Sequence, residues 1–467
     1  MAKKSGESKN KSQQIDGIGI TSDRLTSRGG LAFFVKYIMN IGILAELERR
    51  FGRLRKSSKG APVPEMFKQV LCFLFDGTSR HLTRFDALKE DEGYAGGIET
   101  SPGDMASSHA VKRFFQSFSP VLVWMFRPLL QHLFIWRLRL DQPETIVLGL
   151  DTMVMDNDEA GARQGVQPTY KKVKGFQPLQ LTWGRFIVDA VFRGGKKHSN
   201  HGDTAAKMIL HIVAKIRTGY RGDIPIVLLM DGGFFDQKLF RLFESLDIGY
   251  VCGGRLTEGV KNYVKSVEAS CFQRYENGRQ TWDYLEFGDH PAAWERYRRA
   301  VFCRPRYEDR QGLLEFSRPE SVLYTNLGMG GRIDEELKAV GKQDWLGMEG
   351  IIGLYHGRGR DELVFRSLKD FGFQELPFKK FTPNAALYYV MLLAFFLCEA
   401  YKEDVLGGVI PAVAYPTTLR RKAVDFAAKI VRSGGRSILK VTRAVWEGLN
   451  LPLLWERSHC PPKICWD

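Results

Sequence analysis

Apolar residues in the first third of the chain recur at the spacing of amphipathic helices. This pattern runs over Leu31–Phe51, Pro64–Phe75 and Val121–Leu140, with Pro64 well suited to the first turn of a helix. It predicts a helical region over residues 21–143. Residues 1–20 are polar, basic and without periodicity, so we expect a disordered arm there.

One segment of this helical region carries positive charge. Ser107 or Ser108 is a suitable cap for a helix, and its basic edge holds Lys112 and Arg113 beside the apolar Val111. A helix-turn-helix-like unit lying on DNA and a solvated amphipathic helix explain this pattern equally well. Lys112 and Arg113 are therefore candidate DNA contacts.

From residue 144 the pattern changes to short, continuously apolar runs, which are typical of buried strands. Ile146–Leu150 ends in Asp151, and Ile224–Met230 ends in Asp231. Two more strand candidates and one helix candidate occupy the same stretch: Phe186–Phe192, Ile248–Cys252 and Phe235–Leu246. Alternation of strands and helices predicts an α/β sheet with helices on its faces. We place the first part of this core at residues 144–253.

The alternation breaks over residues 254–345, which are rich in arginine and aromatic residues. Strand-like pieces there are Thr281–Phe287, Ala300–Arg304 and Ser321–Thr325. They predict a β-rich insertion subdomain between the two parts of the core. Helical periodicity returns over residues 346–402, the second part of the core. The basic C-terminal region, residues 403–467, is expected to be mostly helical.

The apolar run Ala385–Cys398 is too short to cross a membrane, which takes about 20 residues. A buried helix is the better interpretation, and we expect no membrane partner. The N-terminus has no secretory signal pattern, and the seven cysteines include no CxxC pair. Both observations favour a cytoplasmic protein.

The net charge of the chain indicates the kind of partner that it binds. The 467 residues include 68 Lys and Arg against 53 Asp and Glu, a formal net charge of +15. An excess of this size favours a polyanionic partner, because each neutralised phosphate releases condensed counterions. Nucleic acid is the leading candidate, and an anionic membrane surface is the alternative.

Asp151 and Asp231 are candidate metal ligands. Each follows an apolar strand, and the ends of neighbouring parallel strands are where α/β sheets place their ligands. Adjacent carboxylates repel each other unless a cation lies between them, and oxygen ligands of this kind suit Mg²⁺. A third carboxylate completes a site for two ions, and Glu362 is the best candidate. We expect magnesium, with manganese able to replace it.

Glu362 belongs to a segment with two distinct faces. At about 100° per residue, Glu362, Arg366 and Lys369 fall on one face of a helix. The opposite face carries Val364, Leu368 and Phe371. Such a helix packs its apolar side on the sheet and presents the acid and the two cations to solvent or substrate.

Two other polar clusters have competing explanations. The spacing of His198, His201 and Asp203 suits a metal, but a polar loop with Asp203 as a helix cap explains it better. The run of Lys171, Lys172 and Lys174 is either a DNA contact close to Asp151 or a solvated charge cluster.

The spacing of Tyr355, Arg358, Glu362 and Lys369 resembles the Tyr-Arg-Glu-Lys signature of bacterial insertion-sequence transposases of the Asp-Asp-Glu (DDE) type. The resemblance is to the superfamily named for insertion sequence four, and most of all to its thirteen-eighty group. It implies an RNase H-like catalytic core, a mixed sheet flanked by helices and interrupted by the β-rich insertion.

The resemblance also implies roles for particular residues. Asp151, Asp231 and Glu362 would be the catalytic, metal-binding acids, while Tyr355, Arg358 and Lys369 would grip DNA, with Arg366 beside them. The insertion would offer an aromatic ring to a flipped base, for which Trp282 and Trp294 are candidates. Gly357 and Gly359 weaken a helix by nearly ~1 kcal/mol each, so we expect Tyr355 and Arg358 on a loop before it.

The function implied is that of a transposase. Such an enzyme would bind terminal inverted repeats as a dimer, cleave the transposon ends and transfer the 3'-hydroxyl strands to target double-stranded DNA. Two alternatives stay open: a DNA-binding regulator that has lost catalysis, and an RNase H-like nuclease without strand transfer.

Overall fold

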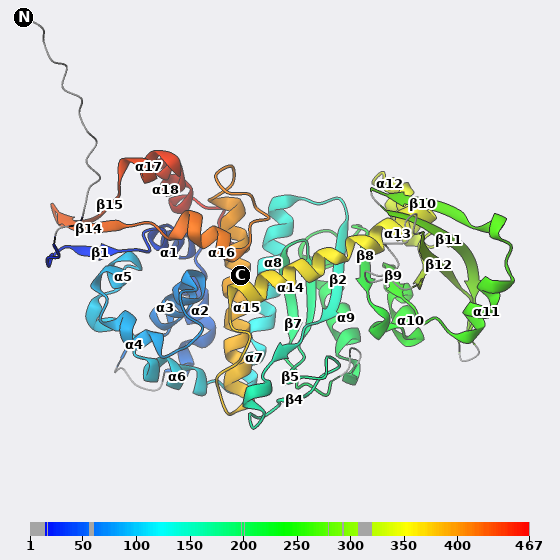
Figure 1. The fold of residues 1–467 in the computed structure, drawn as a ribbon, viewed down its shortest axis with the longest axis horizontal. Helices are drawn as coiled ribbons and strands as arrows, with labels where there is room; N and C mark the ends of the chain where they lie inside the picture. Colours follow the sequence, from blue (N-terminus) through cyan, green and yellow to red (C-terminus); the bar gives the residue numbers. More distant parts are fainter. Residues whose placement is uncertain are drawn as a thin grey trace, which may run out of the picture.

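A nine-stranded mixed sheet forms the centre of the chain, with helices of the N-terminal region at one end and the inserted strands at the other (Figure 1). The computed structural model describes residues 15, 17–55, 60–197, 199, 201–278, 280–291, 294–306 and 320–466. Most of the expected N-terminal arm, residues 1–20, lies outside the described residues.

The N-terminal region is helical, as predicted, apart from one short strand. Its elements are β1 (Arg24–Thr26), α1 (Leu31–Asn40), α2 (Ile43–Phe51), α3 (Val63–Asp76), α4 (Arg84–Lys89), α5 (Glu92–Gly97), α6 (Ser108–Gln116), α7 (Pro120–Trp124) and α8 (Phe126–Asp141). Ser107 caps α6, because its hydroxyl accepts a hydrogen bond from the amide of Ala110 at 3.3 Å.

The core of the sheet contains the strands expected from the apolar runs and one that was not expected. They are β2 (Ile146–Thr152), β6 (Leu179–Trp183), β7 (Phe186–Val191), β8 (Ile226–Met230) and β9 (Gly249–Gly253). Their order is β7-β6-β2-β8-β9, antiparallel from β7 to β2 and parallel from β2 to β9. A small second sheet of β3 (Met155–Asp156), β4 (Gln167–Pro168) and β5 (Lys174–Phe176) follows β2.

The strands of the insertion extend this same sheet. They are β10 (Gln273–Asn277), β11 (Gln280–Asp289), β12 (Arg298–Arg306) and β13 (Ser321–Thr325), with the helices α11 (Glu258–Ser266) and α12 (Arg332–Ala339). Strand β13 pairs with β9, so the inserted strands and the core share one set of backbone hydrogen bonds. The described part of the insertion is therefore continuous with the core sheet.

Helices cover both faces of the core. Apolar residues of α8, α9 (Thr204–Gly219), α10 (Gln237–Ser245) and α15 (Phe381–Asp404) share one hydrophobic core with one face of β2 and β8. Residues of α12 and α13 (Met348–Gly357) pack on the other face. Among the described helices, α15 alone is long and apolar enough to cross a membrane, and 89% of its apolar window is buried inside the protein. The length argument from the run Ala385–Cys398 is wrong, because the helix has 24 residues, whereas its burial confirms the expected buried helix.

The prediction of a mostly helical C-terminal region is wrong for its middle part. After α16 (Pro416–Leu419), the chain forms the antiparallel hairpin of β14 (Ala428–Ser433) and β15 (Arg436–Lys440), followed by α17 (Arg443–Gly448) and α18 (Leu451–His459). Gly434 and Gly435 have φ angles of 58° and 73°, which suit a two-residue hairpin turn. Strand β14 also pairs with β1, which a local sequence pattern cannot reveal.

Arg420 ties three regions of the chain together. Its side chain is buried, and it donates hydrogen bonds to the carbonyl oxygens of Leu74 (2.8 Å), Phe75 (2.9 Å) and Phe371 (2.6 Å). Leu74 and Phe75 lie in the last turn of α3, and Phe371 ends α14 (Gly359–Phe371). A cation beside the C-terminal carbonyls of two helices also interacts favourably with their dipoles.

Replacing Arg420 by Ala should lower the free energy of unfolding by roughly 3 kcal/mol or more, because each buried acceptor left unsatisfied costs about 1–3 kcal/mol. The Arg420→Lys variant should have a free energy of unfolding between those of the unaltered chain and of Arg420→Ala, because one ammonium cannot replace the spread donors of a guanidinium. Urea denaturation followed by circular dichroism measures the difference. A loss below about 0.5 kcal/mol for Arg420→Ala, the size of an ordinary surface substitution, would contradict this role.

Candidate active site

Strand register brings Asp151 and Asp231 together. Leu150 of β2 pairs with Met230 of β8 in a parallel ladder, so the next residue on each strand is an aspartate at the same edge of the sheet. Leu150 and Met230 face the main core, while Leu229 belongs to the core that packs under α13. Side chains alternate between the faces of a strand, so both carboxylates lie on the face covered by α13.

Each aspartate also has a local role in the backbone. Asp231 caps the turn that follows β8, because its Oδ1 accepts a hydrogen bond from the amide of Gly233 at 2.9 Å. Asp151 Oδ1 accepts from the amide of Thr152 at 2.6 Å, which leaves Oδ2 for another partner. That partner is Arg358, whose Nη1 lies 3.1 Å from Asp151 Oδ2.

Tyr355 and Arg358 do not lie on a loop, so that expectation is wrong. Tyr355 is in α13, and Arg358 is the single residue, itself in helical conformation, that joins α13 to α14. The cost of Gly357 and Gly359 is offset because Ile351 and Ile352 of α13 are fully buried against the sheet. Tertiary packing supplies most helix stability in proteins.

Tyr355 positions Arg358. The ring of Tyr355 lies beneath the guanidinium, with 5.7 Å from its centroid to Arg358 Cζ. Its hydroxyl lies over Gly253 at the end of β9, where a Cβ would come within 2.6 Å of the phenol oxygen. Burial raises the pKa of Tyr355, so the phenol is neutral at pH 7. A fixed neutral ring under the cation favours the orientation toward Asp151.

Helix α14 has the two faces expected of it. Val364, Leu368 and Phe371 are buried, whereas Glu362 and Arg366 are exposed and Lys369 is half-buried. Burial lowers the pKa of Lys369, and the positive charge of Lys171 lowers it further. Lys171, in the turn after β4, therefore lies near Lys369 in the last turn of α14.

Tyr170 lies near enough to all three acids to be affected by their charges. It lies in the turn between β4 and β5 and is 61% exposed. The pKa of its phenol is raised, first by burial of the hydroxyl end and then by the negative charges of Asp151, Asp231 and Glu362, in that order. All three carboxylates therefore act on one phenol. Sequence reasoning missed Tyr170, whose only signal was its place beside the lysine run near Asp151.

Residues 8–448 match the family described as Transposase DDE domain group 1. The chain belongs to this family. A comparison with curated proteins finds no match. Among solved structures, one that is similar is the cryo-EM structure of the piggyBac transposase synaptic complex with hairpin DNA, with 12% sequence identity. That similarity covers 85% of this chain and 80% of the other, with a TM-score of 0.40.

DDE transposase domains generally use divalent metal ions, and the chemistry of the three acids fits such an ion. Asp151, Asp231 and Glu362 offer hard carboxylate oxygens, the ligands that Mg²⁺ and Mn²⁺ prefer. Within the described residues, no three acidic, histidine or cysteine side chains are already gathered as a metal site. Arg358 instead supplies the positive charge next to Asp151. A metal would therefore compete with Arg358 for that carboxylate.

Of the two tryptophans proposed to stack on a base, Trp282 is buried and Trp294 is half-buried. Trp282 is 3% exposed, and its ring packs on His356 of α13 at 4.8 Å. Trp294 is half-buried between Phe235 (5.0 Å) and Tyr324 (5.6 Å). Trp282 is thus not available to a base in this structure, and it supports the helix that carries Tyr355 instead.

The remaining candidates lie on α6 and in the loop before α9. Arg113 on α6 is exposed, and Lys112 lines a cavity of about 790 Å³ between α6 and the loop after β3. Their role in DNA binding stays a prediction. Asp203 precedes α9 but makes no capping hydrogen bond from its side chain, so that expectation is wrong. Of the two histidines in this cluster, His198 lies outside the described residues, and Nε2 of His201 lies 2.7 Å from Lys197 Nζ.

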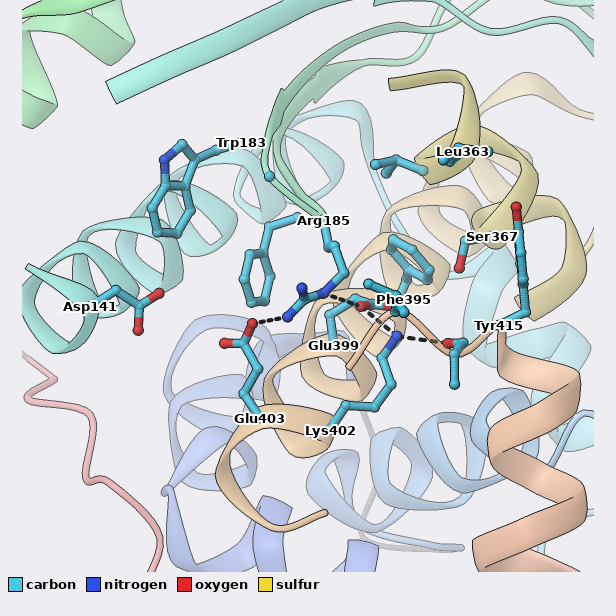
Figure 2. Close-up of a pocket in the computed structure, with 15 residues that line it drawn as sticks. Asp141, Trp183, Arg185, Leu363, Ser367, Phe395, Glu399, Lys402, Glu403 and Tyr415 are labelled. Carbon is cyan, nitrogen blue, oxygen red and sulfur yellow. Dashed lines mark hydrogen bonds and ion pairs between the residues drawn. The ribbon is translucent and has the colours of Figure 1, made fainter. Parts of the chain in front are cut away.

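Helix α14 also lines a cavity of about 540 Å³ (Figure 2). Leu363 and Ser367 line it from α14. Lys402 Nζ lies 2.6 Å from Glu399 Oε2 within α15, and Arg185, in the turn between β6 and β7, bonds to Glu403 of α15. The second pair joins α15 to the β6–β7 turn.

The pKa of Tyr170 offers a test of whether all three carboxylates lie near this phenol. Carboxylate charges disfavour the phenolate, so Asp151→Asn, Asp231→Asn and Glu362→Gln should each lower the Tyr170 pKa toward its usual value. Carbon-13 NMR of ring-labelled tyrosine reports the titration, with Tyr170→Phe to assign the signal. Glu159→Gln, an exposed acid after β3, is the matched control. A Tyr170 pKa that none of the three variants moves would contradict the arrangement.

Proposed function

We propose that this chain is a DNA transposase that binds terminal inverted repeats, cleaves the transposon ends and joins the freed 3'-hydroxyl strands to target DNA. Membership of the DDE family supports the class of activity. The observation that carries the proposal is the parallel pairing of Leu150 with Met230, from which Asp151 and Asp231 follow as neighbours on the face under α13.

Asp151, Asp231 and Glu362 are the catalytic acids of this proposal, and they hold two Mg²⁺ ions that Mn²⁺ can replace. When bound, such ions activate an attacking hydroxyl and stabilise the charge on the leaving oxygen of a phosphodiester. The carboxylates need this positive charge, because two adjacent anions at one sheet edge repel each other.

Arg358, Arg366 and Lys369 bind the phosphate backbone in this proposal. Arg358 offers a planar pair of N–H donors that matches a phosphate. When DNA binds, its guanidinium leaves the Asp151 carboxylate and binds a phosphate of the substrate. Tyr355 keeps the guanidinium aimed at the same place. Arg366 is exposed one turn beyond Glu362, so it lies along the path of a strand that passes the acids.

We also propose an RNase H-like core and membership of the superfamily named for insertion sequence four, in its thirteen-eighty group. The core is supported by three antiparallel strands, β7-β6-β2, followed by the parallel β8 and β9. The subgroup is supported by the spacing of Tyr355, Arg358, Glu362 and Lys369.

The partners we propose are the double-stranded DNA of the transposon ends and of the target. The net charge of +15 supports a polyanionic partner, with Lys112 and Arg113 as candidate contacts in the N-terminal region. Because two ends must be held together for excision, we propose a homodimer in the synaptic complex. We place the activity in the bacterial cytoplasm.

Replacing Asp151, Asp231 or Glu362 by Ala should reduce Mg²⁺-dependent cleavage of an end-bearing duplex at least about a hundredfold. Even partners that only orient a metal ligand typically cost 10–100-fold, so loss of a ligand should exceed this. Excision and strand-transfer products on labelled DNA measure the effect, with Glu159→Ala as the control.

The same variants should still bind the duplex in a mobility-shift assay, which separates loss of chemistry from loss of folding. Full cleavage by any one of the three Ala variants would remove that residue from the catalytic set. Metal-independent binding without any cleavage by the unaltered chain would favour a DNA-binding regulator instead.

A further inference from the structure

The hairpin of β14 and β15 forms a ribbon that reaches one end of the molecule (Figure 1). Its base is anchored, because β14 pairs with β1 and Ile430 packs against α5. A Cβ on Gly96 of α5 would come within 2.8 Å of Ile430 Cδ1, so the contact is close. Toward the turn at Gly434, the residues of both strands become exposed.

The charge of this ribbon is of one sign. Residues 428–440 include Lys429, Arg432, Arg436 and Lys440 and no acidic residue. Lys429 pairs with Asp23 at 2.8 Å. In the part of the chain that the structure describes, Arg432, Arg436 and Lys440 have no ion pair, although surface arginines elsewhere in the protein do. The exposed end of the ribbon therefore carries uncompensated positive charge.

The two arginines nearest the turn lie on opposite faces of the ribbon. Arg436 is paired with Ser433, and Arg432 is paired with Ser437. Successive residues of a strand alternate between its faces, so Arg432 shares a face with Ile430 while Arg436 shares the other with Ile438. A polyanion that flanks the ribbon on both sides would meet one guanidinium on each.

We propose that the β14–β15 ribbon binds double-stranded DNA by entering a groove, with Arg432 and Arg436 contacting the phosphate backbones on its two sides. The major groove is about 12 Å wide and admits a two-stranded ribbon. The two phosphate walls match the arrangement of one arginine on each face. This contact is separate from the three carboxylates and does not depend on catalysis, so it goes beyond the proposed function.

The test measures how salt weakens DNA binding by the full chain, in EDTA and with a duplex of arbitrary sequence. Each phosphate contact contributes about 0.9 to the slope of log affinity against log salt. The double variant Arg432→Ala/Arg436→Ala should therefore lower the slope by about 2. Circular dichroism and urea denaturation confirm that the variant is folded.

A double variant on α9, Lys207→Ala/Lys215→Ala, is the matched control. Both lysines are exposed, and the change removes the same formal charge away from the ribbon. Its slope should stay close to that of the unaltered chain. An unchanged slope in the ribbon variant, or an equal loss in the control, would overturn the proposal.

Anionic vesicles of phosphatidylserine and phosphatidylcholine distinguish DNA from a membrane surface. If the ribbon variant loses vesicle binding and keeps its DNA slope, the ribbon is a membrane contact and the proposal is wrong. A catalytically inactive Asp231→Ala chain should give the full salt slope. The salt slope therefore tests the ribbon contact, whereas DNA cleavage tests the catalytic assignment, and either can fail without the other.

Discussion

The ion pair between Asp151 and Arg358 joins residues 207 positions apart in the sequence, with 3.1 Å between Nη1 and Oδ2. It connects the carboxyl edge of the sheet to the point where α13 becomes α14, one turn before Glu362. Two adjacent aspartates at this edge need a nearby positive charge, and Arg358 provides it. The burial of Ile351 and Ile352 and the fit of Tyr355 over Gly253 hold that cation in reach.

Local patterns predicted the parts of the fold that depend on burial alone. Continuous apolar runs indicated β2 and β8 with their terminal acids, because a strand buried on both faces is apolar throughout. Strand β6 was missed because it buries polar residues: Gln180 is fully buried and donates to the hydroxyl of Tyr388 at 2.6 Å. The hairpin of β14 and β15 was missed since its partner β1 lies at the other end of the chain.

In the candidate site, too, local patterns predicted some features and missed others. The face of α14 that carries Glu362 followed from helical periodicity, and the burial of Leu368 agrees with it. Tyr170 could not be found, because its position depends on how a small separate sheet folds back toward the acids. Exposure of an aromatic ring is likewise not encoded locally, so the sequence could not show that Trp282, a candidate for stacking on a base, is buried. Tyr355 is helical despite two nearby glycines because tertiary packing outweighs propensity.

The most direct test of the central claim is anomalous X-ray diffraction from crystals of the chain grown with Mn²⁺ and an end-bearing duplex. We predict a manganese peak within about 2.1 Å of carboxylate oxygens from both Asp151 and Asp231, with Arg358 displaced from Asp151 onto the DNA. Manganese bound only at other acidic residues, with the Asp151–Arg358 pair intact beside the DNA, would contradict the account.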